Sequence, residues 1–228
     1  MLRNIAADRL LKLPAAISFE TAAAMMLKGM TAQYLLHGVY SVKRGDTILV
    51  HAAAGGVGLI LCQWAKAIGA TVIGTVGDDE KAKLARSFGC DHPVSYRSGN
   101  FADRVKEITG GAGVAAVYDS VGRDTFDRSL ECLAPLGTLA LYGQSSGPVP
   151  AFDLARLAPK SAFVTRPTLF TWTAKRADLE RIGNSLFDAV TSGKVRIEIN
   201  QTYPLREAAR AHADLEARKT TGSTVLLP

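Results

Sequence analysis

Short apolar runs alternate with amphipathic stretches over most of the chain. The clearest run, 47–50, is continuous and rich in β-branched residues, which is typical of a strand buried on both faces of a parallel sheet. Similar runs lie at 71–76, 93–96, 114–119, 137–142 and 161–164. Between them, apolar residues recur at helical spacing over 59–68, 78–88, 101–108 and 124–133. This alternation predicts an α/β fold built on a parallel sheet.

The two ends of the chain follow other patterns. Ser18 stands as an N-cap before a helical pattern over 19–36, which Gly29 is expected to break or bend. After residue 165 we expect a helix over 174–191, a half-exposed strand over 195–199, a helix over 205–217 and a strand over 223–227. The segment 143–150 is predicted to be a loop. Right-handed crossovers would give a doubly wound sheet with a ligand crevice at the carboxyl ends of its strands.

The segment from His51 to Gly58, HAAAGGVG, follows the first strand and opens a helix. A pyrophosphate binds the free backbone N–H groups and the positive dipole end of a helix N-terminus. Side chains would block that approach, so Ala53 and Gly56 stand where small residues are needed, and Gly55 adds backbone freedom. A glycine-rich run alone is a weak signal, but here strand, turn, helix and second strand are all present. The segment therefore predicts a dinucleotide site.

The end of the second strand favours NADP(H) over NAD(H). An acid commonly stands there to bind the ribose 2′-hydroxyl. Thr75 and Val76 occupy that region, and without an acid a 2′-phosphate meets no repulsion. Lys81, one helical turn beyond Gly77, either supplies positive charge or is a solvated helix residue, and its spacing leaves both open. The acids at 78–79 are counter-evidence, although they also suit the start of a helix.

Composition narrows the class of protein. The 228 residues, 47% hydrophobic and 21% charged, can bury a sizeable core. The net charge of +6 is scattered and lacks the basic stripe with aromatics that nucleic-acid binding requires. The apolar stretch 47–65 contains His51, Gln63 and three glycines, which predicts a strand, a turn and a helix rather than a membrane span. With no signal peptide visible, we expect a cytoplasmic protein without nucleic-acid or membrane partners.

Neither metal ligands nor a catalytic constellation emerges from the sequence. Cys62, Cys90 and Cys132 are far apart, so we expect three small buried hydrophobes rather than a zinc site or disulfides. The four histidines are separated as well: His37, His51, His92 and His212. Only His51 lies near the phosphate turn, and no residue is assigned as catalytic acid or base.

Further motifs resemble one family. The order AAAGGVG, GTVG, YDSVG and YGQSSG resembles the zeta-crystallin-like quinone oxidoreductases, zinc-free members of the medium-chain dehydrogenase/reductase superfamily. LPAAISFE at 13–20, KGMTA at 28–32, YPL at 203–205 and the segment 209–212 also resemble them. The resemblance covers nearly the whole chain. It implies NADPH as cofactor, a quinone as substrate and direct hydride transfer without a metal.

The resemblance also implies three groups of cofactor contacts. The pyrophosphate group is Ala54, Gly55, Gly56 and Val57. The adenosine group is Gly77, Lys81 and Tyr96 around the 2′-phosphate, Ser120 on the adenosine side and Arg218 as a further phosphate or cofactor contact. The nicotinamide group is Tyr142, Gln144 and Ser145, joined by the cofactor contact Thr31 and by the loop residues Thr168 and Leu169. Without the resemblance, Tyr96 and Tyr142 could equally be packed aromatics with satisfied hydroxyls.

One departure from the family bears on function. Family members carry a GroES-like catalytic domain of about 100 residues before the nucleotide domain. Here we expect a remnant of it at 1–14, a Rossmann domain over 15–165 and a segment returning toward it over 166–228. Because hydride transfer needs a closed, water-excluded cleft, half of that cleft would be missing.

Two functions therefore stay open: a quinone oxidoreductase, or an NADP(H)-binding module without turnover. A zinc alcohol dehydrogenase is disfavoured because the metal ligands are missing. The resemblance further implies a homodimer through the sheet edge formed by 137–142 and 162–165. Apolar surface left exposed by the missing domain would also favour association.

Overall fold

The computed structural model describes residues 4–96 and 99–228. Six parallel strands form its main sheet in the order β3-β2-β1-β4-β5-β6. They are β1 (Thr47–Val50), β2 (Thr71–Val76), β3 (His92–Ser95), β4 (Val114–Asp119), β5 (Leu133–Leu141) and β6 (Phe163–Thr165). The chain runs outward from β1 to β3 and then crosses back to β4, so the strand order reverses between β1 and β4. This confirms the doubly wound Rossmann sheet, whose switch point is where ligands bind.

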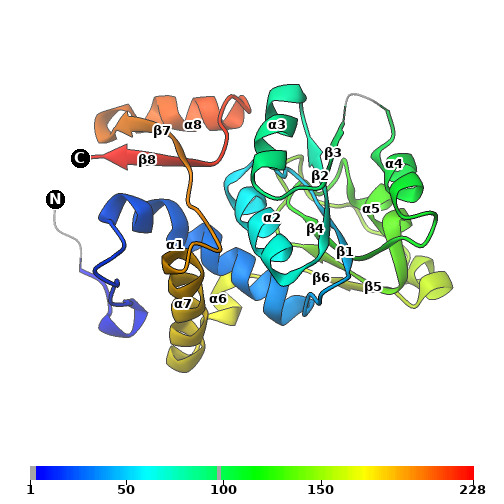
Figure 1. Ribbon diagram of the computed structural model, residues 1–228, viewed down its shortest axis with the longest axis horizontal. Helices are drawn as coiled ribbons and strands as arrows, with labels where there is room; N and C mark the ends of the chain where they lie inside the picture. Colours follow the sequence, from blue (N-terminus) through cyan, green and yellow to red (C-terminus); the bar gives the residue numbers. More distant parts are fainter. Residues whose placement is uncertain (1–3, 97–98) are drawn as a thin grey trace.

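Helices cover both faces of the sheet (Figure 1). On one side lie α1 (Phe19–Tyr34), α2 (Gly56–Ile68) and α3 (Asp79–Ser87); on the other lie α4 (Phe101–Ile108) and α5 (Phe126–Cys132). Because successive strand residues point to opposite faces, Ile48 and Val50 belong to the core beneath α2 while Leu49 belongs to the core beneath α4 and α5. In the described part of the chain, no helix is long and apolar enough to cross a membrane.

The last third of the chain adds α6 (Leu169–Trp172), α7 (Arg176–Thr191), β7 (Ile199–Pro204), α8 (Ala208–Glu216) and β8 (Ser223–Leu227). Strands β7 and β8 pair in parallel as a separate small sheet beside α8, away from the main sheet (Figure 1). Its attachment to α1 includes a hydrogen bond of 3.1 Å from the Ser223 hydroxyl to the Ala24 carbonyl. Short 3₁₀ turns lie at Ala7–Arg9, Leu154–Lys160 and Leu205–Glu207, and a π-helical turn at Leu35–Val39 follows α1. The proposed domain boundaries stay a prediction.

The structure corrects two predictions, the break at Gly29 and the start of the strand at 195. Gly29 does not break α1, which continues through it; a Cβ there would lie 2.5 Å from Leu186 Cδ1, so this glycine lets α7 pack closely on α1. The strand expected at 195–199 begins only at Ile199. The residues before it are hydrogen-bonded to α2 instead. Arg196 N donates to Gln63 Oε1 at 2.8 Å, and Gln63 Nε2 donates to the Arg196 carbonyl at 3.0 Å.

Several other predicted elements have different ends. The sixth strand starts two residues late, at Phe163, because Ser161 takes a left-handed φ of 47° and ends the preceding turn. The fifth strand starts earlier than expected, at Leu133, directly after α5. The helix predicted over 205–217 begins as a short 3₁₀ turn and is α-helical only from Ala208.

Candidate functional site

The phosphate turn joins β1 to α2 at the switch point of the sheet. Ala52 adopts a left-handed φ of 51°, and its carbonyl accepts a hydrogen bond of 2.9 Å from Gly55 N. A Cβ on Gly58 would lie 2.8 Å from Ala53 Cα, so only glycine lets the helix pack on the turn. Gly55 is the N-cap of α2 and offers no side-chain cap. The N-cap side chain therefore does not occupy the first N–H groups of α2, and these groups can bind an anion such as a pyrophosphate.

The N-terminus of α2 also touches α1 and the last loop of the chain. Gly222 N donates to the Ala54 carbonyl at 3.0 Å, and Gly222 pairs with Gly55 in an isolated parallel bridge. The stem of Lys28, from α1, lies so close that a Cβ on Gly56 would be 2.6 Å from its Cδ. Lys28 is half-buried, and this burial lowers the pKa of its ammonium. Lys28 was not among the site residues expected from the sequence.

The structure brings Lys81, Tyr96 and Arg218 together near the end of β2. Lys81 Nζ donates to the Arg218 carbonyl at 2.9 Å. The charge of Arg218 also acts on the Tyr96 hydroxyl, although burial dominates and raises the pKa of Tyr96 to about 12. Beside them, a Cβ on Gly77 would meet nothing within 4 Å. Asp78 serves as the N-cap of α3, since its carboxylate accepts from Lys81 N at 2.8 Å; this accounts for the acid that seemed to argue against NADP(H).

A buried histidine lies beneath this group. His51 Nδ1 is 2.9 Å from Thr75 Oγ1 and 3.2 Å from the Tyr96 hydroxyl, and its Nε2 is 2.9 Å from Ser129 Oγ. The Thr75 hydroxyl donates to the Tyr96 oxygen at 2.5 Å. Burial lowers the pKa of His51, and the nearby charge of Asp119 only partly opposes this effect. The imidazole is therefore neutral and hydrogen-bonded on both nitrogens, consistent with the structural role expected for it.

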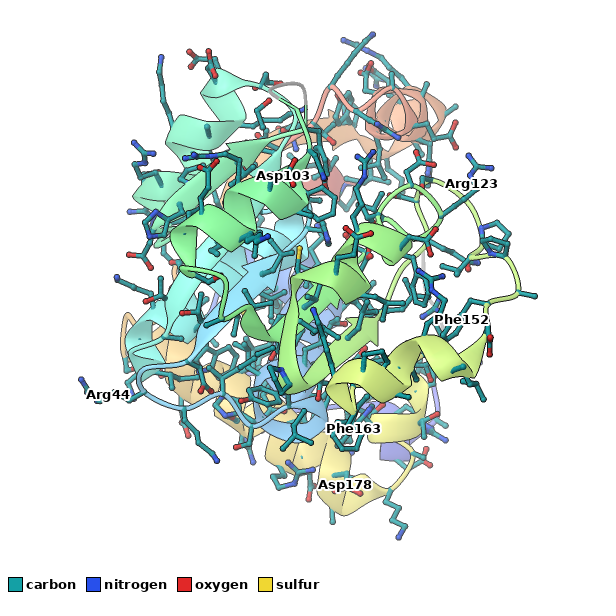
Figure 2. The ribbon with its side chains drawn as sticks, turned by 90° about the vertical axis from the view of Figure 1, so that its right-hand side faces the viewer. Arg44, Asp103, Arg123, Phe152, Phe163 and Asp178 are labelled. Carbon is teal, nitrogen blue, oxygen red and sulfur yellow. The ribbon has the colours of Figure 1, made fainter. Side chains whose placement is uncertain are left out.

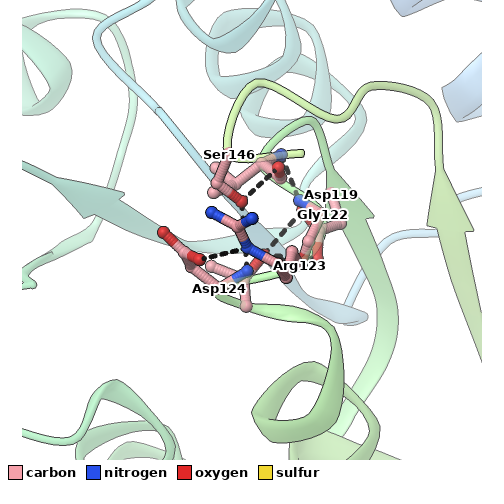
Figure 3. Close-up of polar contacts among 7 residues, drawn as sticks. Asp119, Gly122, Arg123, Asp124 and Ser146 are labelled. Atoms are coloured by element: carbon pink, nitrogen blue, oxygen red, sulfur yellow. Dashed lines mark hydrogen bonds and ion pairs between the residues drawn. The ribbon is translucent and has the colours of Figure 1, made fainter. Parts of the chain in front are cut away.

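Asp119 organises the loop that follows β4. Its carboxylate accepts from Ser129 Oγ at 3.2 Å, from Thr125 Oγ1 at 2.8 Å, and from Val121 N and Gly122 N at 2.8 and 3.0 Å. Figure 3 shows how this loop is tied to the next one along the sheet. There, Ser146 Oγ donates to the Val121 carbonyl at 2.8 Å and accepts from the backbone N–H of residue 124 at 3.0 Å. The loops after β4 and β5 thus form one unit.

Ser120 lies beside Tyr142 and Ser145, where the loops after β4 and β5 meet. Ser145 N donates to the Ser120 carbonyl at 3.1 Å, and Tyr142 N donates to the carbonyl of the residue before Ser120 at 2.9 Å. Burial raises the pKa of Tyr142, so its hydroxyl keeps its proton at neutral pH. Gln144 belongs to the same loop, where its carbonyl accepts from Gly147 N at 2.9 Å. Which part of a cofactor Ser120 contacts stays a prediction.

The remaining expected residues lie at the meeting of α1 and α6. Thr31, on α1, is buried and donates to the Leu27 carbonyl at 2.8 Å. Thr168 caps α6, and Leu169 begins that helix and packs against the core cluster that Tyr142 also contacts. A stack of two aromatic rings, Tyr34 and Trp172, joins the helices with centroids 5.6 Å apart and planes 8° from parallel.

Two further features bear on the expectations. Cys62, Cys90 and Cys132 are free and buried, as expected; burial raises the pKa of Cys132 to about 12. Within residues 4–96 and 99–228, no three His, Cys, Asp or Glu side chains gather as a metal site would require. At the sheet edge, β6 pairs with β5, and Phe163 is 58% exposed on that edge strand (Figure 2).

Comparison with known proteins identifies relatives of this arrangement. Residues 56–182 match the model of the family described as zinc-binding dehydrogenase. A quinone oxidoreductase of Pseudomonas aeruginosa is 52% identical over 228 residues, which cover 100% of this chain and 70% of that protein. A 2-haloacrylate reductase of a Burkholderia species is 48% identical, covering 97% of this chain and 68% of that protein.

A solved structure of Escherichia coli quinone oxidoreductase complexed with NADPH superposes with a TM-score of 0.94 at 50% identity, over 97% of this chain and 69% of that one. The chain thus spans about 70% of the length of these relatives. Sequence, sheet order and phosphate turn agree. The chain belongs to the zinc-binding dehydrogenase family, among the quinone oxidoreductases of the medium-chain dehydrogenase/reductase superfamily.

Proposed function

We propose that this chain binds NADPH across the carboxyl ends of its parallel strands and acts as an NADPH-dependent quinone oxidoreductase. One observation carries the cofactor choice: the hydrogen bond from Lys81 to the Arg218 carbonyl brings two cationic residues together, one helical turn beyond the open position at Gly77. A 2′-phosphate is the part of NADPH that NADH lacks, and it needs positive charge where NAD-binding sheets have an acid. The Escherichia coli relative was solved with NADPH, which supports the same choice here.

The pyrophosphate would lie on the uncovered N-terminus of α2, with Ala54 to Val57 beneath it. The half-buried Lys28 adds a positive charge near this N-terminus. A cation held at the positive end of a helix dipole is unfavourable by itself, and an anion placed between them would relieve that repulsion. We therefore add Lys28 to the pyrophosphate group.

The nicotinamide half would lie over the loops after β4 and β5. When bound, NADPH supplies a hydride from its nicotinamide ring. The chain would position the nicotinamide ring. The Asp119 carboxylate fixes the loop after β4, and Ser146 ties that loop to the loop after β5. The protonated Tyr142 hydroxyl is a neutral hydrogen-bonding group between the two loops. Thr31, Thr168 and Leu169 would border the same half from α1 and α6.

Two measurements on the same preparation test this function. NADPH binding is followed by fluorescence titration, and NADPH oxidation is followed with 1,4-benzoquinone and, separately, with 2-chloroacrylate as acceptor. We expect saturable binding and oxidation with the quinone. Binding without oxidation by either acceptor would identify the chain as an NADP(H)-binding module without turnover, and oxidation by 2-chloroacrylate alone would move the substrate class toward that of the Burkholderia relative.

We also propose a homodimer through the edge strand β6. An unpaired edge strand with an exposed aromatic side chain is a template for pairing with another chain. Phe163 is 58% exposed, and Leu136, at the bend of β5, is 64% exposed. Pairing of β6 with a second copy would cover Phe163 and extend the sheet across the dimer.

A further inference from the structure

A chain of five side chains runs beneath the site: Tyr96, Thr75, His51, Ser129 and Asp119, here called the buried polar chain. Tyr96 directly follows β3, and His51 directly follows β1. Thr75 lies in β2, Ser129 in α5 and Asp119 in β4. The four members other than Tyr96 are 0% exposed. Buried polar groups carry a high cost if unpaired, so each proton in this chain must have a definite place.

The direction of the hydrogen bonds follows from Asp119. A carboxylate can only accept, and a hydrogen bond to it is stronger than one to a neutral group, so the Ser129 proton points to Asp119. The Ser129 oxygen then accepts from His51 Nε2, which must carry the imidazole proton. Burial keeps His51 neutral, and therefore its Nδ1 is a bare acceptor. Nδ1 needs a hydroxyl proton from a neighbour.

Two hydroxyls compete to supply that proton. Thr75 lies 2.9 Å and Tyr96 3.2 Å from His51 Nδ1, and the two hydroxyl oxygens are 2.5 Å apart. In the arrangement shown, Thr75 donates to the Tyr96 oxygen, so the Tyr96 proton is the one that reaches Nδ1. The Thr75 oxygen in turn accepts from Ala52 N, at the start of the phosphate turn, at 3.3 Å. Tyr96 then has no proton to offer to a ligand.

The two cofactors make different demands on this arrangement. An ionised 2′-phosphate has only acceptor oxygens, so Tyr96 can bind it only by turning its proton outward. His51 Nδ1 would then lose its donor unless Thr75 rotates its own proton from Tyr96 to Nδ1. A ribose 2′-hydroxyl can itself donate to the Tyr96 oxygen, so NADH requires no change in the buried polar chain.

We propose that Thr75 is a positioning residue for the 2′-phosphate: its hydroxyl proton replaces that of Tyr96 at His51 Nδ1 and thereby frees Tyr96 to donate to the phosphate. Thr75 does not touch the cofactor itself, since it is 0% exposed. This role rests on the proposed function, in which Tyr96 contacts the 2′-phosphate. The preference for NADPH over NADH would then depend on a buried residue that does not touch the cofactor.

Equilibrium binding of NADPH and of NADH tests the role without requiring turnover. Thr75→Val has nearly the same shape and lacks the proton, so we expect its dissociation constant for NADPH to rise on the order of tenfold, the scale of one hydrogen bond to a charged group. NADH binding should stay unchanged, and Thr75→Ser should restore NADPH binding. For NADPH, Tyr96→Phe should lose as much affinity as Thr75→Val, and the double variant should lose no more than either one. Thr138→Val, at a buried threonine of β5 outside the buried polar chain, is the matched control.

Three results would overturn the role of Thr75. They are unchanged NADPH binding in Thr75→Val, an equal loss of both cofactors, or additive losses in the double variant. Thr75→Ala serves as a second variant without the hydroxyl, and circular dichroism checks that each variant is folded. Failure of the proposed function gives a result distinct from these three: the wild-type chain itself would bind NADPH no more tightly than NADH.

Discussion

Lys81 Nζ donates a hydrogen bond of 2.9 Å to the backbone carbonyl of Arg218, a residue 137 positions away in the sequence. Arg218 follows α8 in a left-handed conformation with φ of 59°, which is uncommon for a residue with a side chain. The contact joins the segment between α8 and β8 to the first turn of α3, just after β2. Two cationic residues are thereby brought together from segments that the sequence keeps far apart, and Lys81 Nζ also lies 3.7 Å from the Asp78 carboxylate.

Removing the charge of Lys81 should weaken NADPH selectively. Lys81→Met is expected to raise the dissociation constant for NADPH by about tenfold, the scale of a charged hydrogen bond, and to leave NADH binding unchanged. Lys83→Met is the control, because Lys83 lies on the same helix but is exposed and paired with Glu80 at 2.7 Å. Equal behaviour of the two variants in a fluorescence titration would argue against a 2′-phosphate beside Lys81.

Two glycines of the site should respond in opposite ways to a methyl group. Gly58→Ala should lower the free energy of unfolding by about 1–3 kcal/mol, because its Cβ would press on the backbone of Ala53. Gly77→Ala should leave stability unchanged, since its Cβ meets nothing within 4 Å, but should weaken NADPH binding by filling the open position. Urea unfolding and cofactor titration measure the two effects. A stable Gly58→Ala variant would show that the turn can relax.

Lys28→Met should weaken both cofactors equally. The pyrophosphate is common to NADPH and NADH, so the loss of a charge beside the N-terminus of α2 cannot discriminate between them. The matched control is Lys43→Met, at an exposed lysine just before β1. Titration of each variant with both cofactors gives the comparison, and a loss confined to NADPH would place Lys28 near the 2′-phosphate instead.

Stability should fall in mildly acidic solution because of His51. Its pKa in the unfolded chain is near the ordinary 6.5, and burial lowers it in the fold. Below that pH the unfolded chain binds a proton that the native state does not, so the stabilisation present above about 6.5 is lost as the pH falls. Urea unfolding at several pH values should give a shallower dependence for His51→Gln; burial also lowers the pKa of His37, so part of the slope remains.

For this comparison the control is His212→Gln, at an exposed position on α8, which should keep the wild-type slope. Comparing slopes removes any constant loss of stability that a substitution causes by itself. An unchanged slope in His51→Gln would mean that His51 is not the group that titrates on unfolding.

A charge on the edge strand should prevent dimer formation. Phe163→Lys places a solvated cation where two β6 strands would meet, and charged residues on an edge oppose pairing. Phe170→Lys, at a residue that is 83% exposed on α6, changes a comparable side chain away from the edge. Sedimentation velocity should show a dimer for the wild-type chain and Phe170→Lys and a monomer for Phe163→Lys. A wild-type monomer would remove the proposed interface.

The local part of the fold was predictable because local residues determine it. Ser18 caps α1 as expected, and Gly69 ends α2 with a left-handed φ of 99°. Asp78, expected only to suit the start of a helix, is the N-cap of α3. The apolar runs gave the six strands of the main sheet because strands buried on both faces are continuous in sequence. Family motifs supplied the adenosine group, whose members Lys81, Tyr96 and Arg218 do come together.

Tertiary contacts account for what could not be predicted. The position of Lys28 over Gly56 depends on how α1 crosses α2, and the delayed start of β7 depends on Gln63 binding Arg196. The partners of His51 come from elements that pattern alone does not bring together: Thr75 is 24 residues away and Ser129 is 78 residues away. Thr75 itself was noted only as a residue that is not acidic.

Equilibrium titration of the wild-type chain with NADPH and with NADH tests the central claim most directly. The positive residues beside Gly77 predict that NADPH binds more tightly by at least about tenfold, or ~1.4 kcal/mol. Equal affinities, tighter binding of NADH, or no saturable binding of NADPH would contradict the claim.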